Sequence, residues 1–292
     1  MKQFLPPALF AVLLALTSCT SEIMTKRITI SQARSCSNNV VDFGWDGGVI
    51  NYHEMRRIGV DLLIHRATRG GTKTDDDYAR REGPARSAGL KWGAYHYIKR
   101  SENLSAQIHR FVSTVRAISA RNGTWGHPVM LVLDNEGTDR VSWDRLAVAA
   151  RQVRGHTGVW PLLYCSVPSP GTAAFNQQTR ELSYLSSHDK ETLRACGLWV
   201  PRYGDGASGS VTFSVPRVFG DWTLWQYCGD VSGRPKHALA AHEFSGQVGA
   251  AYTRSGGSSS LRHFCDRNLF NGSRGQFESF YRSHSSAPGN WR

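Results

Sequence analysis

Short apolar runs alternate with amphipathic segments along most of this chain, and this alternation limits the available folds more than any other feature. The runs occur at 40–43, 62–65, 92–98, 129–133, 161–165, 198–200 and 223–227. They are apolar nearly throughout, as strands covered on both faces should be. Between them, 102–119 carries its apolar residues along one helical face, and 75–89 and 143–154 are compatible with helices. Because strands that alternate with helices usually pair in parallel, the sequence predicts an α/β fold.

The run 129–133 ends in the tetrad Leu133-Asp134-Asn135-Glu136. Residues two apart on a strand point to the same face, so Asp134 and Glu136 are expected side by side. Neighbouring carboxylates repel, which raises the pKa of one of them and lets it hold a proton near neutral pH. One protonated and one ionised carboxylate are what glycosidic bond cleavage needs. An isolated Asp-x-Glu is more often an acidic loop after a core strand, so the choice between a loop and a catalytic pair depends on the other motifs of the chain.

The first residues have the composition of an export signal. One Lys precedes an apolar stretch of about a dozen residues, which is too short to span a bilayer comfortably. Leu16-Thr17-Ser18-Cys19 resembles a bacterial lipobox, in which Cys19 is acylated and anchors the protein to a membrane. An ordinary signal peptide cleaved nearby is the alternative. The sequence therefore predicts a signal peptide over 1–18, lipidation at Cys19 and a polar tether over 19–39.

The formal net charge of +12 raises the question of a polyanionic partner. The basic residues are scattered singly and the chain carries an export signal, so the expected partner is an anionic cell envelope and not nucleic acid. The chain has 6 Cys, and if Cys19 carries lipid, at most two disulfides can form among the others. Their connectivity stays open. No CxxC or His-rich pair supports a metal site.

Polar and aromatic residues recur where the predicted strands end. The segments are Asp42-Phe43-Gly44-Trp45, the GAYHY of 93–97, the tetrad ending in Glu136, the WVPRY of 199–203, the WQY of 225–227 and the DRNLF of 266–270. In this order they resemble the glycoside hydrolase family 25 lysozymes, secreted N-acetylmuramidases that cut peptidoglycan. No single segment would be specific, but their type and order together are. The resemblance covers roughly residues 40–271.

The resemblance implies an irregular TIM-like (β/α) barrel with parallel strands and fewer helices than a full eightfold barrel. It also implies cleavage of the β-1,4 bond between N-acetylmuramic acid and N-acetylglucosamine in glycan strands, without a cofactor. Glu136 matches the general acid and Asp134 the carboxylate that assists on the other side of the sugar. Asp42 and Asp266 match two further active-site aspartates. Whether Asp134 attacks the sugar or orients its acetamido group is left open.

Aromatic side chains near these strand ends are candidates for stacking on sugar rings, because their flat faces suit the apolar faces of pyranoses. The candidates are Tyr95, Tyr164, Trp199, Tyr203 and Trp225. Each could instead be core packing, and His96 is equally open between site and core. A phenol can also hydrogen-bond to substrate, which favours Tyr95 and Tyr203.

Three stretches depart from the family pattern or from the strand–helix order. The first motif reads DFGWDGG, which leaves the contacts near Trp45 and Asp46 in doubt. Residues 229–262 are rich in Gly, Ser and Ala and are predicted to be an insertion, and 272–292 to be a flexible tail. A non-catalytic peptidoglycan-binding lipoprotein is the alternative function. The presence of all four acidic residues favours an enzyme, and the oligomeric state is not indicated.

Overall fold

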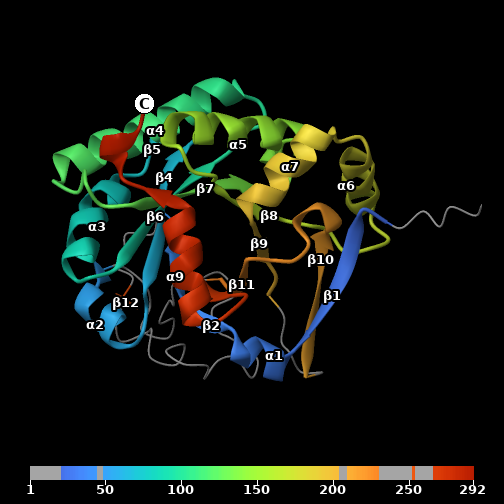
Figure 1. Ribbon diagram of the computed structural model, residues 1–292, viewed down its shortest axis with the longest axis horizontal. Helices are drawn as coiled ribbons and strands as arrows, with labels where there is room; N and C mark the ends of the chain where they lie inside the picture. Colours follow the sequence, from blue (N-terminus) through green and yellow to red (C-terminus); the bar gives the residue numbers. More distant parts are fainter. Residues whose placement is uncertain (1–20, 45–48, 204–208, 230–251, 254–265) are drawn as a thin grey trace, which may run out of the picture.

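The centre of the molecule is a closed β-barrel (Figure 1). The computed structural model describes residues 21–44, 49–203, 209–229, 252–253 and 266–292. In this part of the chain the barrel strands are β2 (Ser37–Phe43), β4 (Leu62–Arg69), β6 (Lys91–Tyr97), β7 (Val129–Asn135), β8 (Leu162–Cys165), β9 (Leu198–Pro201), β11 (Leu224–Cys228) and β13 (Asp266–Phe270). Neighbouring strands run parallel from β2 to β11, whereas β13 is antiparallel to both of its neighbours. The predicted α/β barrel is thus confirmed.

Helices surround the barrel in chain order (Figure 1). They are α1 (Ile30–Ser35), α2 (Tyr52–Arg57), α3 (Asp76–Ser87), α4 (Leu104–Arg121), α5 (Trp143–Thr157), α6 (Ala173–Ser183), α7 (Ser187–Cys196) and α9 (Arg274–Ser283). The barrel is irregular because not every strand leads into a helix. In the described part of the connection after β9, the chain forms β10 (Ser210–Pro216), which pairs with β1 (Ile23–Thr29) outside the barrel.

Two hydrophobic cores explain why the strands read as apolar throughout. On β7, Val129, Leu131 and Leu133 face the helices, whereas Met130 and Val132 face the barrel interior. Both faces are shielded from water, so neither needs polar residues. The inward residues stack below the carboxyl ends of the strands and form a solid base for whatever lies at those ends.

The predicted tether over 19–39 is wrong from Ile23 onward. Residues 23–29 form β1, which pairs with β10 along its whole length. Thr29 and Gln32 then form a reciprocal capping box that starts α1. Polar residues are frequent here because β1 alternates half-buried and exposed residues after the buried Ile23, so composition alone suggested a linker.

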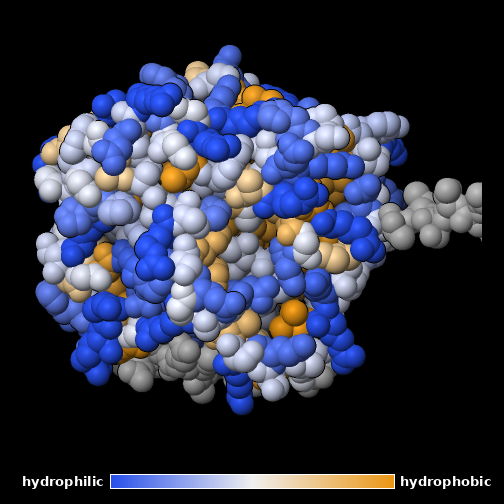
Figure 2. All heavy atoms as spheres, viewed as in Figure 1, coloured by the Kyte–Doolittle hydropathy of each residue, from blue (hydrophilic) through white to orange (hydrophobic). Residues whose placement is uncertain are grey.

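The predicted flexible tail over 272–292 is also wrong. Helix α9 lies across one end of the barrel (Figure 1), and its residues Phe277 and Tyr281 belong to the interior core. The Tyr281 hydroxyl donates to the carbonyl of Pro128 at 2.9 Å, at the start of β7. The face that carries α9 is hydrophilic over most of its area (Figure 2), which is why the segment reads as polar. α9 therefore closes the end of the barrel opposite the carboxyl ends of the strands.

Other predicted segments lie outside the described residues. These are the signal peptide at 1–18, Cys19 and most of the insertion 229–262, of which β12 (Tyr252–Thr253) pairs with β3 (Val49–Ile50). Among the helices of the described ranges, none combines the length and apolar character required to cross a bilayer.

Candidate active site

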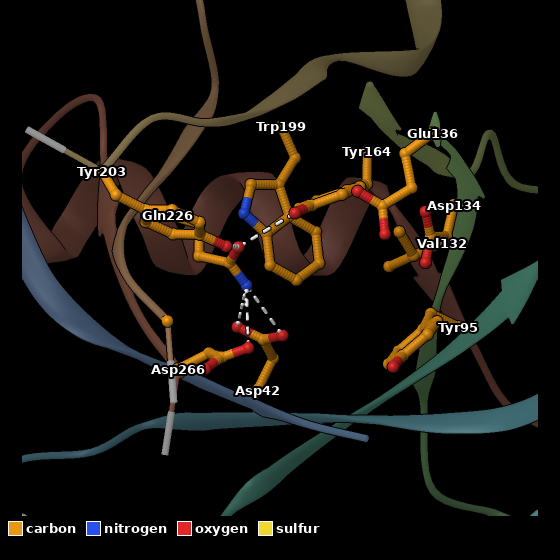
Figure 3. Close-up of a pocket in the computed structure, with 11 residues that line it drawn as sticks. Asp42, Tyr95, Val132, Asp134, Glu136, Tyr164, Trp199, Tyr203, Gln226 and Asp266 are labelled. Carbon is orange, nitrogen blue, oxygen red and sulfur yellow. Dashed lines mark hydrogen bonds between the residues drawn. The ribbon is translucent and has the colours of Figure 1, made fainter. Parts of the chain in front are cut away.

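A cavity of about 390 Å³ opens at the carboxyl ends of the barrel strands (Figure 3). Because parallel strands end on one side of a barrel, inward side chains from several strands converge there. The lining residues are Asp42, Tyr95, Val132, Asp134, Glu136, Tyr164, Trp199, Tyr203, Gln226, Gly229 and Asp266. All four carboxylates predicted from the sequence thus meet in one cavity.

The end of β7 directs Asp134 and Glu136 into the cavity as strand alternation predicts (Figure 3). Asn135, between them, points the other way, where its side-chain amide donates to the Val141 carbonyl at 3.1 Å and accepts from the Val141 N–H at 2.8 Å. This pair of hydrogen bonds holds the loop that follows β7. Gly137 makes the turn with a φ of 59°, a conformation that favours glycine.

Burial controls the protonation of this carboxylate pair. Asp134 is only 7% exposed, and its Oδ1 has no hydrogen-bond partner among the described residues. Burial raises the pKa of Asp134 well above its usual range, and the charge of Glu136 raises it further. Burial also raises the pKa of Glu136, which is less enclosed. The pair therefore retains a proton at a higher pH than isolated carboxyls do, with desolvation as the main cause and mutual repulsion second.

Replacing Asp134 with Asn is expected to stabilise the protein at pH 7. The ionised form of a buried, unpartnered carboxylate costs free energy, and the neutral amide removes about 1 kcal/mol of this cost. That corresponds to a Tm increase of about 2–4 °C in a domain of this size. Because the folded pKa is raised, the penalty grows as pH rises from the unfolded value of ~4 through the folded value. The difference in Tm should therefore shrink towards pH 4.

Asp42→Asn is the matched control for that measurement, because the Asp42 carboxylate accepts hydrogen bonds from two amide groups. In the Asp42→Asn variant the new amide N–H would face the amide donors that bind the carboxylate in the native protein, so the Tm of this variant should fall. Calorimetry from pH 4 to pH 8 compares both variants with the native protein. An Asp134→Asn variant less stable than the native protein at pH 7 would contradict the burial argument.

Asp42 and Asp266 face each other because β2 and β13 pair in register at these two residues. The Gln226 side chain donates to both oxygens of Asp42, at 3.0 and 3.1 Å, and to Asp266 at 3.3 Å (Figure 3). Asn268 also donates to Asp42, at 2.8 Å, and accepts from the Trp199 indole at 2.8 Å. These contacts fix the orientation of both aspartates on the side of the cavity away from Asp134.

Gln226 organises this half of the site, although it was not among the predicted site residues. Its carbonyl oxygen accepts from the Tyr164 hydroxyl at 2.9 Å and from the Tyr203 hydroxyl. Burial raises the pKa of both phenols, so they keep the protons that they donate. The two tyrosines and two aspartates also fix the amide orientation, since a flipped amide would set its oxygen against the carboxylates.

Four of the five predicted aromatic residues line the cavity, namely Tyr95, Tyr164, Trp199 and Tyr203. Trp225 does not. It is fully buried in the core between barrel and helices, and its indole donates to the Arg202 carbonyl at 2.8 Å. His96 is likewise buried outside the cavity, between Thr68 and Gln107, and burial lowers its pKa to about 4.

In the described ranges, no group of three or more His, Cys, Asp or Glu residues is arranged to hold a metal ion. Cys165 and Cys196 are free, buried thiols, and burial raises the pKa of each. The polar side chains that line the cavity carry carboxylates, phenols, an amide and an indole.

Comparisons with known proteins agree with this geometry. Residues 41–233 match the sequence pattern of the glycosyl hydrolases family 25. An autolytic lysozyme from Clostridium acetobutylicum is 33% identical over 72 residues, which are 25% of this chain and 22% of that protein. Muramidase from Trichobolus zukalii superposes with a TM-score of 0.55 and 19% identity, over 84% of this chain and 99% of the muramidase. The bacterial lysozyme from Streptomyces coelicolor gives 0.53 and 21%, over 82% and 95%. At these identities the two structures establish the likeness of fold.

Proposed function

Because the chain belongs to family 25 of the glycosyl hydrolases, we propose that it hydrolyses the β-1,4 bond between N-acetylmuramic acid and N-acetylglucosamine in peptidoglycan. The observation that carries this proposal is the pair Asp134 and Glu136 at the wall of a cavity that also holds two further aspartates. A raised proton affinity in such a pair suits an acid that works near neutral pH.

Glu136 is the proposed general acid. It is less enclosed than Asp134, so it can reach the oxygen of a glycosidic bond in the cavity. Its proton passes to the leaving oxygen as the bond to the anomeric carbon breaks, and water completes the hydrolysis. Asp134, which lines the same cavity, assists on the other side of the sugar, either by bonding to the anomeric carbon or by orienting the acetamido group of the sugar.

The remaining residues position the substrate. Tyr164 and Trp199 meet edge to face, with ring centroids 5.0 Å apart, and together present an aromatic wall. Asp42 and Asp266, held by Gln226, offer acceptors to sugar hydroxyls or amides. In this proposal proton transfer takes place at β7, and the residues that orient the substrate come from β2, β8, β9 and β13, with Gln226 of β11 holding the two aspartates.

Analysis of the new reducing ends tests the proposal. Purified peptidoglycan is digested, the products are reduced with borohydride, and the reduced sugar is identified by mass spectrometry. We expect reduced N-acetylmuramic acid. Reduced N-acetylglucosamine would show a glucosaminidase, and binding to peptidoglycan without any new reducing end would show a non-catalytic binding protein.

We also propose export and a lipid anchor at Cys19, supported by the apolar segment and the Leu16-Thr17-Ser18-Cys19 sequence. The anchor would hold the enzyme at the cell envelope, close to its substrate. Mass spectrometry of the mature N-terminus decides the point, since an unmodified N-terminus at another residue excludes the anchor.

A further inference from the structure

Arg69 lies on the β4 side of the carboxylate pair, two strands away from Asp134. Arg69 on β4 pairs in register with Tyr97 on β6, which in turn pairs with Asp134 on β7. Neighbouring strands lie ~4.8 Å apart, so the Arg69 backbone is roughly 10 Å from that of Asp134. The Arg69 guanidinium lies over the Tyr97 ring, 4.8 Å from its centroid, and its charge opposes the rise in the Asp134 pKa. Arg69 therefore belongs to the surroundings of the proposed reaction centre.

Lys73 is the cross-strand partner of Arg69 in the short hairpin of β4 with β5 (Lys73–Thr74). Like charges placed directly opposite each other destabilise a strand pair. Both side chains are exposed, and neither forms an ion pair with any residue that the structure describes. Nearby cations are paired, since Arg66 binds Asp75 and Lys99 binds Asp139. Arg69 and Lys73 thus set two like charges opposite each other, without an ion-pair partner in the described part of the chain.

A second cavity, of about 310 Å³, lies at this pair. Its lining residues are Arg66, Arg69, Lys73, Thr74, Asp75 and Asp76. Asp75 is buried and engaged by Arg66 and by the start of α3, which leaves Asp76 as the exposed acid. Arg66 connects this cavity to the first one. A Cβ atom placed on Gly44 would lie 4.0 Å from the Arg66 guanidinium and 3.5 Å from the Tyr95 hydroxyl, so these two side chains approach each other. Arg66 lines the second cavity and Tyr95 lines the first, so the two cavities are neighbours, and an anion held by Arg69 and Lys73 would belong to a part of the substrate that extends out of the first cavity.

We infer that Arg69 and Lys73 form an anion subsite for a carboxylate on the 3-O-lactyl substituent of the muramic acid sugar. The inference rests on the proposed function, because that substituent, free or extended by its stem peptide, distinguishes muramic acid from N-acetylglucosamine. A carboxylate between the two cations would relieve their repulsion and form charge-assisted hydrogen bonds. The subsite would also offset the repulsion between an anionic substrate and the four carboxylates of the first cavity.

Binding measurements separate the subsite from catalysis. The protein carries Glu136→Gln so that the ligand stays intact, and the ligands are soluble disaccharide-peptide fragments and the same fragments with all carboxyls converted to methylamides. Calorimetry should show that the native fragment binds at least roughly tenfold more tightly, as one or two charge-assisted hydrogen bonds allow. Adding Arg69→Gln and Lys73→Gln should reduce affinity for the native fragment to that for the amidated one.

Arg121→Gln with Arg282→Gln is the matched control, because it removes the same charge from exposed positions at the end of α4 and on α9. This control should keep the tenfold preference. A disaccharide without its peptide carries a free lactyl carboxylate, which in the peptide-bearing fragment is an uncharged amide. Weaker binding of this disaccharide by the Arg69→Gln, Lys73→Gln protein would place the contact at the lactyl carboxylate, and unchanged binding would place it at the carboxylates of the peptide.

An unchanged ratio between native and amidated fragments in the Arg69→Gln, Lys73→Gln protein would overturn the subsite. That result is separate from failure of the proposed function, which is read from the reducing ends made by the protein with Glu136 intact. The two substitutions remove a repulsion and also the contact of Arg69 with the Tyr97 ring, so Tm should change little, and a thermal scan of the variant by differential scanning calorimetry checks that it is folded.

Discussion

Glu136→Gln is expected to lower peptidoglycan turnover by at least roughly a hundredfold, which is the usual effect of losing a positioned general acid. Glutamine keeps the size and hydrogen-bonding capacity of the side chain but cannot release a proton to the leaving oxygen. The release of reducing ends from purified peptidoglycan measures turnover, and a pull-down with insoluble peptidoglycan measures binding, which should persist.

Glu278→Gln is the matched control for that substitution. Glu278 lies on α9 and pairs with Lys91 at 2.8 Å, at the end of the barrel opposite the cavity. The same chemical change there should leave turnover within about twofold, because a surface ion pair contributes little. Native-like digestion by Glu136→Gln would remove Glu136 from the role of acid and leave Asp134 as the group to test.

Phe277→Ala is expected to lower the free energy of unfolding by about 3–5 kcal/mol, as truncation of a buried Phe usually does. Phe277 is only 1% exposed and packs against Phe270, with ring centroids 5.5 Å apart, in the floor of the barrel. Its loss leaves a void where β13 meets α9. Urea denaturation followed by circular dichroism gives the free energy from the midpoint and slope of the transition.

Ser279→Ala on the exposed side of the same helix controls for effects on helix formation and should change stability by less than about 0.5 kcal/mol. If Phe277→Ala cost less than about 1 kcal/mol, α9 would be a peripheral helix, and residues 272–292 would again resemble the loose tail that their composition suggests.

The sequence identified the barrel strands because burial on both faces leaves long apolar runs that helices and loops lack. Val129–Leu133 is such a run, and β7 begins at the same residue. The Asp134 and Glu136 side chains follow from the same geometry, since strand alternation fixes their relative direction. The apolar runs do not indicate which face of a strand points into the barrel, because both faces are equally apolar.

This ambiguity explains the two errors at β11. Trp225 looked like a sugar-stacking residue, yet its face of the strand belongs to the outer core. Gln226 occupies the opposite face and binds Asp42 and Asp266. A polar residue between two large aromatic ones was the available signal, since a glutamine on a fully buried strand needs partners and these gather where the site is.

Polar composition misled the interpretation of both ends of the barrel domain. Phe277 and Tyr281 are spaced four apart, which places them on one face of a helix, but the surrounding Ser, Arg and Gly residues suggested a tail. A helix that seals a barrel needs only a narrow apolar stripe. Average composition over the segment cannot reveal such a stripe.

Strand β13 closes the barrel by pairing with the first barrel strand, β2, and with β11. This has a consequence for when the protein can fold. Its Asn268 contacts Asp42, which lies 226 positions earlier in the chain. A contact between residues so far apart in the sequence forms late and slowly, because most of the chain has to lose conformational entropy before the contact can stabilise the fold. A chain still being synthesised would therefore present an open sheet until residues beyond 266 were available. Such a delay is compatible with the export proposed above, because a chain that folds late can pass through a translocon before it acquires its native structure.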